Sequence, residues 1–224
     1  MKYCALFILI TCVSSSAWGD QSSASPQPAS WRLEESDQGV EVYSRDSFDS
    51  AYREIKAQAT VQSSLKKLIS FLQDADINQQ WVPYSGGVNI IDQPNSHTSY
   101  VHFLMNARWP FENRDSVAKF TLSQDTLSHV VTITILSIPD KIPPTLGRVR
   151  ITKFSGEWRL APTDANTTRI TYQSHIEPGG FIPAWLSNSL SYTTTLKSLH
   201  NLRSLIGDYS YDQEQYPFIS NAME

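Results

Sequence analysis

The chain has 224 residues, of which 40% are apolar and 18% are charged. This composition is typical of a globular domain and excludes a disordered tail, a collagen and a multi-pass membrane protein. With 18 basic and 22 acidic side chains the net charge is −4, so no phosphate-binding face is indicated and we expect no nucleic acid among the partners.

Residues 1–19 are predicted to form a secretory signal peptide. Lys2 precedes an apolar run over residues 4–13, and Ala17 and Gly19 are small residues at the spacing that signal peptidase recognises. The run is too short to span the roughly 30 Å of a bilayer's hydrocarbon core. We therefore expect an exported protein, periplasmic or secreted; a retained anchor and a lipidated Cys12 are the alternatives.

Cysteine usage and composition divide the rest of the chain. Both cysteines, Cys4 and Cys12, lie in the leader, so the mature chain has no disulfide, which suits a bacterial periplasm. Residues 20–30 are rich in Ser, Ala, Pro and Gln and are predicted to be a linker. One domain is expected over residues 31–207, followed by a polar, tyrosine-bearing tail at 208–224.

The domain opens with two predicted strands, at residues 40–44 and 52–61, the second with apolar and polar residues alternating. Ser63 or Ser64 can cap a helix that ends near Asp74, and a short helix carrying Trp81 follows. Six further extended runs are predicted at residues 88–92, 98–107, 115–123, 130–138, 148–160 and 169–176. A long helix from Pro183 to Ile206 completes an α+β order, with an antiparallel sheet wrapped on the terminal helix.

The long helix is amphipathic, but the middle of its apolar arc carries small hydroxylated residues such as Ser189. This pattern leaves two interpretations open, namely opposing aromatic side chains that fill the gap between helix and sheet, or a space left between them. Alternate residues of a strand share one face, but the sequence does not show which face points inward. Tyr100, His102 and Leu104 are therefore the alternative inward-facing set to Val101, Phe103 and Met105. The candidate lining residues are Val101, Phe103, Met105, Phe120, Ile133, Tyr172, Trp185, Ser189 and Tyr192.

Two motifs carry a family resemblance: Trp-Pro-Phe at 109–111 followed by Arg114 and Asp115, and Glu-Pro-Gly-Gly-Phe-Ile-Pro-Ala-Trp-Leu at 177–186. Together they resemble the START (StAR-related lipid-transfer) family over about residues 31–207. Weaker matches in family order are Trp31, Leu33, Gly39, Val40, Val42, Tyr43, Arg148 or Arg150, Gly156, Trp158 and Leu160. The resemblance implies a helix-grip fold in which a curved antiparallel sheet grips the terminal helix around a tunnel that holds one lipid.

The resemblance also implies a mobile lid, for which residues 139–147 are the candidate, with Ile142 and Leu146 presenting an apolar tip to a membrane. A rigid surface turn is the alternative. Some members of the family carry an acid and a base inside the tunnel, but the approximately corresponding positions here are Val101 and Phe120. The ligand is therefore expected to be apolar or weakly polar, and the Arg114–Asp115 pair is expected to make a structural contact.

The predicted function is non-catalytic binding of a single lipid or other hydrophobic ligand, extending to its transport, with transient membrane contact and no cofactor. The five histidines are scattered, so no metal site is indicated. One alternative is a helix-grip enzyme of the cyclase or hydrolase kind, with His102 or His175 as acid or base. Another is a partner-binding module that docks through the tail aromatics Tyr209, Tyr211, Tyr216 and Phe218.

Overall fold

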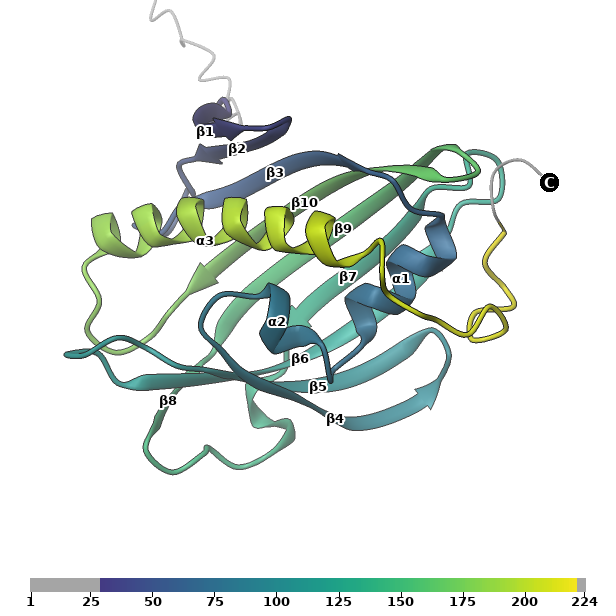
Figure 1. The fold of residues 1–224 in the computed structure, drawn as a ribbon. Coiled ribbons are helices and arrows are strands. Elements are labelled where there is room, and N and C mark those ends of the chain that lie inside the picture. Colours follow the sequence, from purple (N-terminus) through teal and green to yellow (C-terminus); the bar gives the residue numbers. More distant parts are fainter. Residues whose placement is uncertain (1–28, 221–224) are drawn as a thin grey trace, which may run out of the picture.

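Ten strands form one curved sheet in the computed structural model, which describes residues 29–220; the predicted signal peptide lies outside the described residues (Figure 1). The strands are β1 (Arg32–Asp37), β2 (Val40–Arg45), β3 (Glu54–Val61), β4 (Ser85–Asn95), β5 (Thr98–Met105), β6 (Asn113–Gln124), β7 (Val131–Ser137), β8 (Arg148–Ile151), β9 (Lys153–Asp164) and β10 (Thr167–Glu177). Their order is β1-β2-β3-β10-β9-β7-β6-β5-β4, with antiparallel neighbours throughout, and β8 pairs with β6 in parallel. The α+β helix-grip prediction is confirmed.

The helices are α1 (Leu65–Gln73), α2 (Asn78–Trp81) and α3 (Ala184–Leu205), with a short 3-10 helix at Pro139–Lys141. The hydroxyl of Ser64 caps α1 by accepting a hydrogen bond from the backbone N–H of Lys67, so the second of the two predicted caps is used. All three α-helices lie against the same face of the sheet (Figure 1). No helix among residues 29–220 is long and apolar enough to cross a membrane.

Two features of the sheet differ from the sequence prediction. Strand β1 was not predicted, because only its middle residues are partly buried and no clear alternation results. The single run predicted at 148–160 divides at Thr152 into β8 and β9. The division follows from pairing, since β8 joins β6 in parallel whereas β9 lies between β7 and β10.

The hydrophobic core lies between the sheet, α1 and the C-terminal half of α3. Leu199 and Leu202 are completely or almost completely buried in it. Toward the N-terminus of the same helix, Trp185 and Leu190 are exposed. The helix is therefore packed onto the core at one end and is not closed onto the sheet at the other, which leaves room for a cavity.

The tail after α3 is part of the fold rather than a free docking segment. Tyr216 and Ile219 are buried, and the Tyr209 hydroxyl donates a hydrogen bond of 3.0 Å to Asp74 while its ring meets Phe71 edge-on at 5.3 Å. Burial raises the pKa of Tyr216 to about 12. The predicted boundary at residue 207 thus separates the helix from a segment that packs on the same core.

Replacing Tyr216 by alanine should lower the free energy of unfolding by about 3 kcal/mol, because it empties a buried aromatic site. Urea unfolding followed by circular dichroism measures this change. Gln213→Ala, an exposed change in the same tail, should have almost no effect. Equal stabilities of the two variants would contradict the packed tail.

Candidate functional site

A cavity of about 520 Å³ lies between the N-terminal half of α3 and the sheet, within the roughly 300–1,000 Å³ range of small-molecule sites. A second chamber of about 190 Å³ lies beside it, along β5 and β6; we call the two the outer cavity and the inner chamber. The two chambers share wall residues, namely Trp81, Val82, Met105, Ile151, Trp158, Tyr172 and Ile176. A ligand longer than the outer cavity could therefore reach the inner chamber by displacing only side chains.

The sheet side of the cavity is aromatic and aliphatic. Trp158 on β9 and Tyr172 on β10 are directly paired across the strands, and their ring centroids are 4.4 Å apart. Trp81 from α2 meets Trp158 edge-on at 6.3 Å. Burial raises the pKa of the Tyr172 hydroxyl, so this group stays neutral at any physiological pH. The wall between the chambers is thus an uncharged aromatic cluster.

The helix side of the cavity is lined by small hydroxylated residues. Ser191 Oγ donates to the carbonyl of Ser187 at 2.8 Å, and Ser198 Oγ donates to that of Thr194 at 2.8 Å. Thr194 Oγ1 donates to the carbonyl of Leu190 at 2.6 Å. Because these donors are satisfied within the helix, the wall can face an aliphatic ligand without leaving a buried donor unpaired.

The structure places four of the predicted lining residues in the chamber walls and five elsewhere. Met105 and Tyr172 line both chambers, while Phe103 and Phe120 line the inner one. Val101 and Ile133 are buried but do not line either chamber; Ile133 packs within the hydrophobic core.

On α3 the face that lines the cavity is opposite to the predicted one. Trp185 and Ser189, which were predicted to face inward, are exposed, whereas Ser187 and Thr194 line the cavity. The side chain of Tyr192 lies beside the cavity, and its hydroxyl accepts a hydrogen bond from Arg53 at 3.1 Å. The inward face of α3 was wrongly predicted because its cavity face carries many hydroxyl groups, which an analysis of hydrophobic periodicity assigns to the solvent side.

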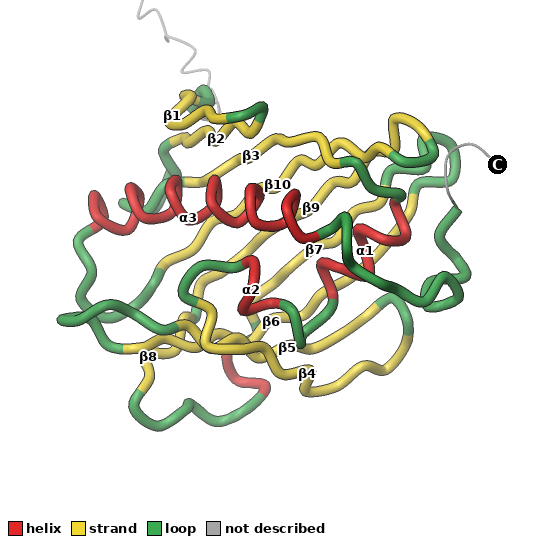
Figure 2. The backbone as a smooth tube through the Cα atoms, viewed as in Figure 1, coloured by secondary structure: helices red, strands yellow, loops and turns green. Residues whose placement is uncertain are grey.

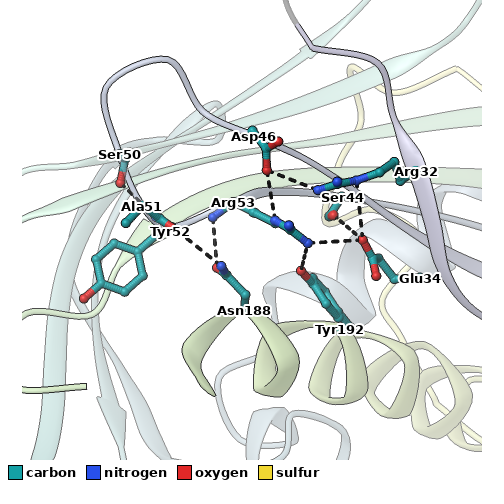
Figure 3. Close-up of polar contacts among 10 residues, drawn as sticks. All are labelled: Arg32, Glu34, Ser44, Asp46, Ser50, Ala51, Tyr52, Arg53, Asn188 and Tyr192. Carbon is teal, nitrogen blue, oxygen red and sulfur yellow. Dashed lines mark hydrogen bonds and ion pairs between the residues drawn. The ribbon is translucent and has the colours of Figure 1, made fainter. Parts of the chain in front are cut away.

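A polar cluster connects this part of α3 to the edge of the sheet (Figure 3). Asn188 accepts a hydrogen bond from the backbone N–H of Arg53 at 2.9 Å and donates to the carbonyl of Ala51 at 3.3 Å. The Arg53 guanidinium pairs with Glu34 at 3.4 Å and Asp46 at 3.0 Å. Its hydrogen bond to Tyr192 is the largest of the contacts that raise the pKa of Arg53. The helix is thus fixed laterally by polar contacts rather than by filling the cavity.

Loops at the N-terminal end of α3 form one end of the cavity. Residues 106–112 and 178–183 lie at this end of the molecule (Figure 2), and several of them line the cavity. Beside these lining residues, Trp109, Phe181 and Trp185 are 92%, 86% and 72% exposed. Large aromatic side chains that contact solvent thus lie beside this end of the cavity; we refer to this end as the mouth and to these three side chains as the aromatic rim.

The START domain family matches residues 12–209. The chain belongs to the START domain family. A STAR-related lipid transfer protein from Xanthomonas axonopodis is 32% identical to this START domain, with a TM-score of 0.73 over 79% of this chain and 98% of the other. Human STARD10 shares the fold at 20% identity, with a TM-score of 0.71 over 80% of this chain and 74% of the other. The uncharacterized protein PA1579 of Pseudomonas aeruginosa is 28% identical over 174 residues, which are 78% of this chain and 85% of that protein.

The loop predicted as the lid of this START domain is pinned to the sheet. Arg150 holds Asp115 through two hydrogen bonds of 3.0 and 2.9 Å and donates to the carbonyls of Ile142 and Pro143. Thr145 in the loop donates to Asp115 at 2.6 Å. Ile142 and Leu146 line neither chamber, and Leu146 is fully exposed. The expected structural contact of Asp115 is therefore present, and it anchors the loop.

Residues with acid–base chemistry lie away from the chambers of this START domain. His102 Nε2 is 2.9 Å from the Asp115 carboxylate, and His175 Nε2 is 3.7 Å from Glu177. The described lining residues include no His, Asp, Glu, Lys or Cys. Within residues 29–220, no group of three such side chains is arranged to hold a metal ion.

The Asp115 network predicts an acid-sensitive stability. Burial opposes ionisation of this carboxylate, but its hydrogen bonds from Arg150, Thr145 and His102 outweigh burial and hold its pKa below the ordinary value. Its stabilisation is therefore complete above the unfolded-state pKa of about 3.9 and is lost as the pH falls through the lower folded-state pKa.

Asp115→Asn should accordingly lower the free energy of unfolding by about 3 kcal/mol at pH 7, since it leaves the buried Arg150 without its counter-ion. The difference from the unsubstituted protein should shrink below about pH 3.9. Urea titrations at several pH values measure it. Asp140→Asn, an exposed change in the same loop, should leave the pH profile unaltered; a constant difference down to pH 2 would contradict the assignment.

Proposed function

We propose that this START domain binds one lipid or other hydrophobic ligand in the cavity under α3, without catalysing a reaction, and carries it between membranes. The observation that supports this function is the internal cavity itself, walled by an aromatic cluster and by hydroxyl groups that the helix already satisfies. Burying a methylene group stabilises the complex by about 0.8 kcal/mol, but a bilayer offers the same stabilisation. A carrier therefore needs wall groups that a hydrocarbon tail can cover without losing hydrogen bonds, and the hydroxyls of Ser191, Thr194 and Ser198 meet that requirement.

The two alternatives find less support. An enzyme of the kind considered from the sequence needs a titratable pair in the cavity, and His102 and His175 lie outside its walls. A partner-binding module needs a free aromatic tail, and Tyr216 is buried in the core.

Filling the cavity tests the proposal. Ser191→Trp places an indole where the ligand would lie, so lipid uptake from vesicles, measured by native mass spectrometry, should fall at least about tenfold. Ser189→Trp adds the same side chain to the exposed side of the same helix and should keep uptake unchanged. A protein that is purified without lipid and takes up none from vesicles would contradict the proposed function.

The proposal includes transient membrane contact through the aromatic rim. Tryptophan side chains favour the interface between headgroups and acyl chains, so Trp109 and Trp185 can hold the mouth against a bilayer. This contact would let the ligand pass without entering water.

Trp109→Ala combined with Trp185→Ala should therefore slow lipid transfer between vesicles about tenfold or more while leaving the amount bound at equilibrium unchanged. Stopped-flow transfer of a fluorescent lipid measures the rate. Leu127→Ala removes an equally exposed apolar side chain from the β6–β7 turn and serves as control. Equal transfer rates for all three proteins would contradict contact through the rim.

An exported location completes the proposal, and the sequence of residues 1–19 supports it. Cell fractionation with an intact-mass measurement tests it. The mature protein should lack these residues and appear outside the cytoplasm; an unprocessed cytoplasmic chain would contradict it.

A further inference from the structure

Arg114, next to the anchored Asp115, is a buried cation that makes no direct ion pair with any residue among 29–220. The residue is 5% exposed and lines the outer cavity. Within residues 29–220 no carboxylate oxygen lies close enough to its guanidinium to form an ion pair, and the acidic residue that acts on it, Glu112, is exposed to solvent. Burial lowers the pKa of Arg114, which reflects the cost of holding this charge away from water.

The neighbouring carboxylate cannot serve as its counter-ion. Consecutive residues of a strand point to opposite faces of the sheet, so Arg114 faces the cavity while Asp115 faces the anchored loop. Asp115 is already held by Arg150 through two hydrogen bonds. In the Arg-Asp motif, the Asp115 carboxylate therefore has a structural role, whereas the Arg114 guanidinium has no ion-pair partner.

The free edge of the guanidinium has a defined shape. Nη1 donates to the carbonyl oxygen of Glu112, but Nε is buried without any partner and Nη2 makes no hydrogen bond to a described residue. Nε–H and Nη2–H point in the same direction from one edge of the group, which is the fork that receives two oxygens of a carboxylate or phosphate. The turn at Gly179 and Gly180, both with positive φ, passes beside Nη2, and a Cβ atom at Gly180 would lie 3.6 Å from it.

Charges along the cavity wall are distributed unequally. The outer cavity is lined by three arginines and no acidic residue among the described lining. Arg53 is neutralised by Glu34 and Asp46, and Arg108 lies over the Tyr84 ring at 5.3 Å in an exposed position. The inner chamber has no charged lining residue and ends among Leu72, Phe120 and Phe154. An elongated ligand would thus find a cation at one end and an aliphatic and aromatic surface at the other.

Building on the proposed lipid-binding function, we infer that the ligand is an amphiphile with an anionic headgroup, whose carboxylate or phosphate oxygens bind the Nε–Nη2 edge of Arg114. Its aliphatic part lies along Trp158 and Tyr172 and extends toward the inner chamber. This replaces the expectation of an apolar or weakly polar ligand, which rested on the uncharged positions Val101 and Phe120. It also assigns Arg114 to ligand binding, where a purely structural contact was expected.

The test compares four probes of matched chain length: palmitate and its neutral analogue hexadecanol, and 1-palmitoyl-lysophosphatidate and its neutral analogue 1-monopalmitoylglycerol. Binding to the full chain is measured by native mass spectrometry and by calorimetry below the critical micelle concentrations. The unsubstituted protein should prefer an anion over its neutral analogue by roughly 10- to 100-fold, the effect of two charge-assisted hydrogen bonds. Preference within only one pair supports the inference and identifies the headgroup as carboxylate or phosphate.

Arg114→Gln should abolish the preference while retaining binding of the neutral probes. Arg114→Lys keeps the charge but loses the fork, so it should retain only part of the preference. Arg169→Gln removes the same charge from an exposed site on β10 and should keep the full preference. If Arg114→Gln does not fold, the Arg114→Lys variant and the comparison of anionic with neutral probes still test whether Arg114 binds the headgroup.

Equal binding of anionic and neutral probes, or an unchanged preference in Arg114→Gln, would overturn the headgroup assignment and leave lipid binding intact. Failure of all four probes to bind the unsubstituted protein would instead count against the proposed function itself. The two failures are therefore distinguishable.

Discussion

The cavity depends on how α3 is held. Its C-terminal half packs against the core through Leu199 and Leu202, whereas its N-terminal half is fixed by the polar contacts of Asn188 and Tyr192 with the strand edge. Polar contacts at the side of a helix restrain its position without requiring large apolar side chains beneath it. The small residues at positions 187, 191 and 194 then leave volume that leucines would fill.

Most strands and helices could be predicted from the sequence, because alternating apolar residues and helix caps mark them locally. The alternation of Ile55, Ala57 and Ala59 identified a half-buried strand, and all three residues are buried in β3. The serine cap located the start of α1. Strand β1 and the division at Thr152 were missed because they depend on pairing with distant strands, which no local pattern records.

The cavity was harder to predict than the fold around it. Residues on strands, such as Phe103 and Met105, were found because period two groups them, although the same logic could not separate them from Val101, which does not line the chambers. On α3 the prediction of the inward face failed at Trp185 and Ser189, since the cavity face carries hydroxyl groups, such as those of Ser191 and Ser198, that bond within the helix and resemble a solvent face. The ligand-binding role inferred for Arg114 could not be reached from the sequence, because its partners could be counted only once the environment of Asp115 was known.

The back-bonded hydroxyls of α3 have a consequence for selectivity. The hydroxyls of Ser191, Thr194 and Ser198 already donate within the helix, so they offer a hydrocarbon tail no directional hydrogen bond. This face of the cavity therefore does not select a ligand by the length or shape of its tail. Selectivity among ligands would then depend on the groups at the ends of the ligand rather than on its tail. Ligands whose tails differ only in unsaturation or by a few carbons would then contact this part of the wall in the same way.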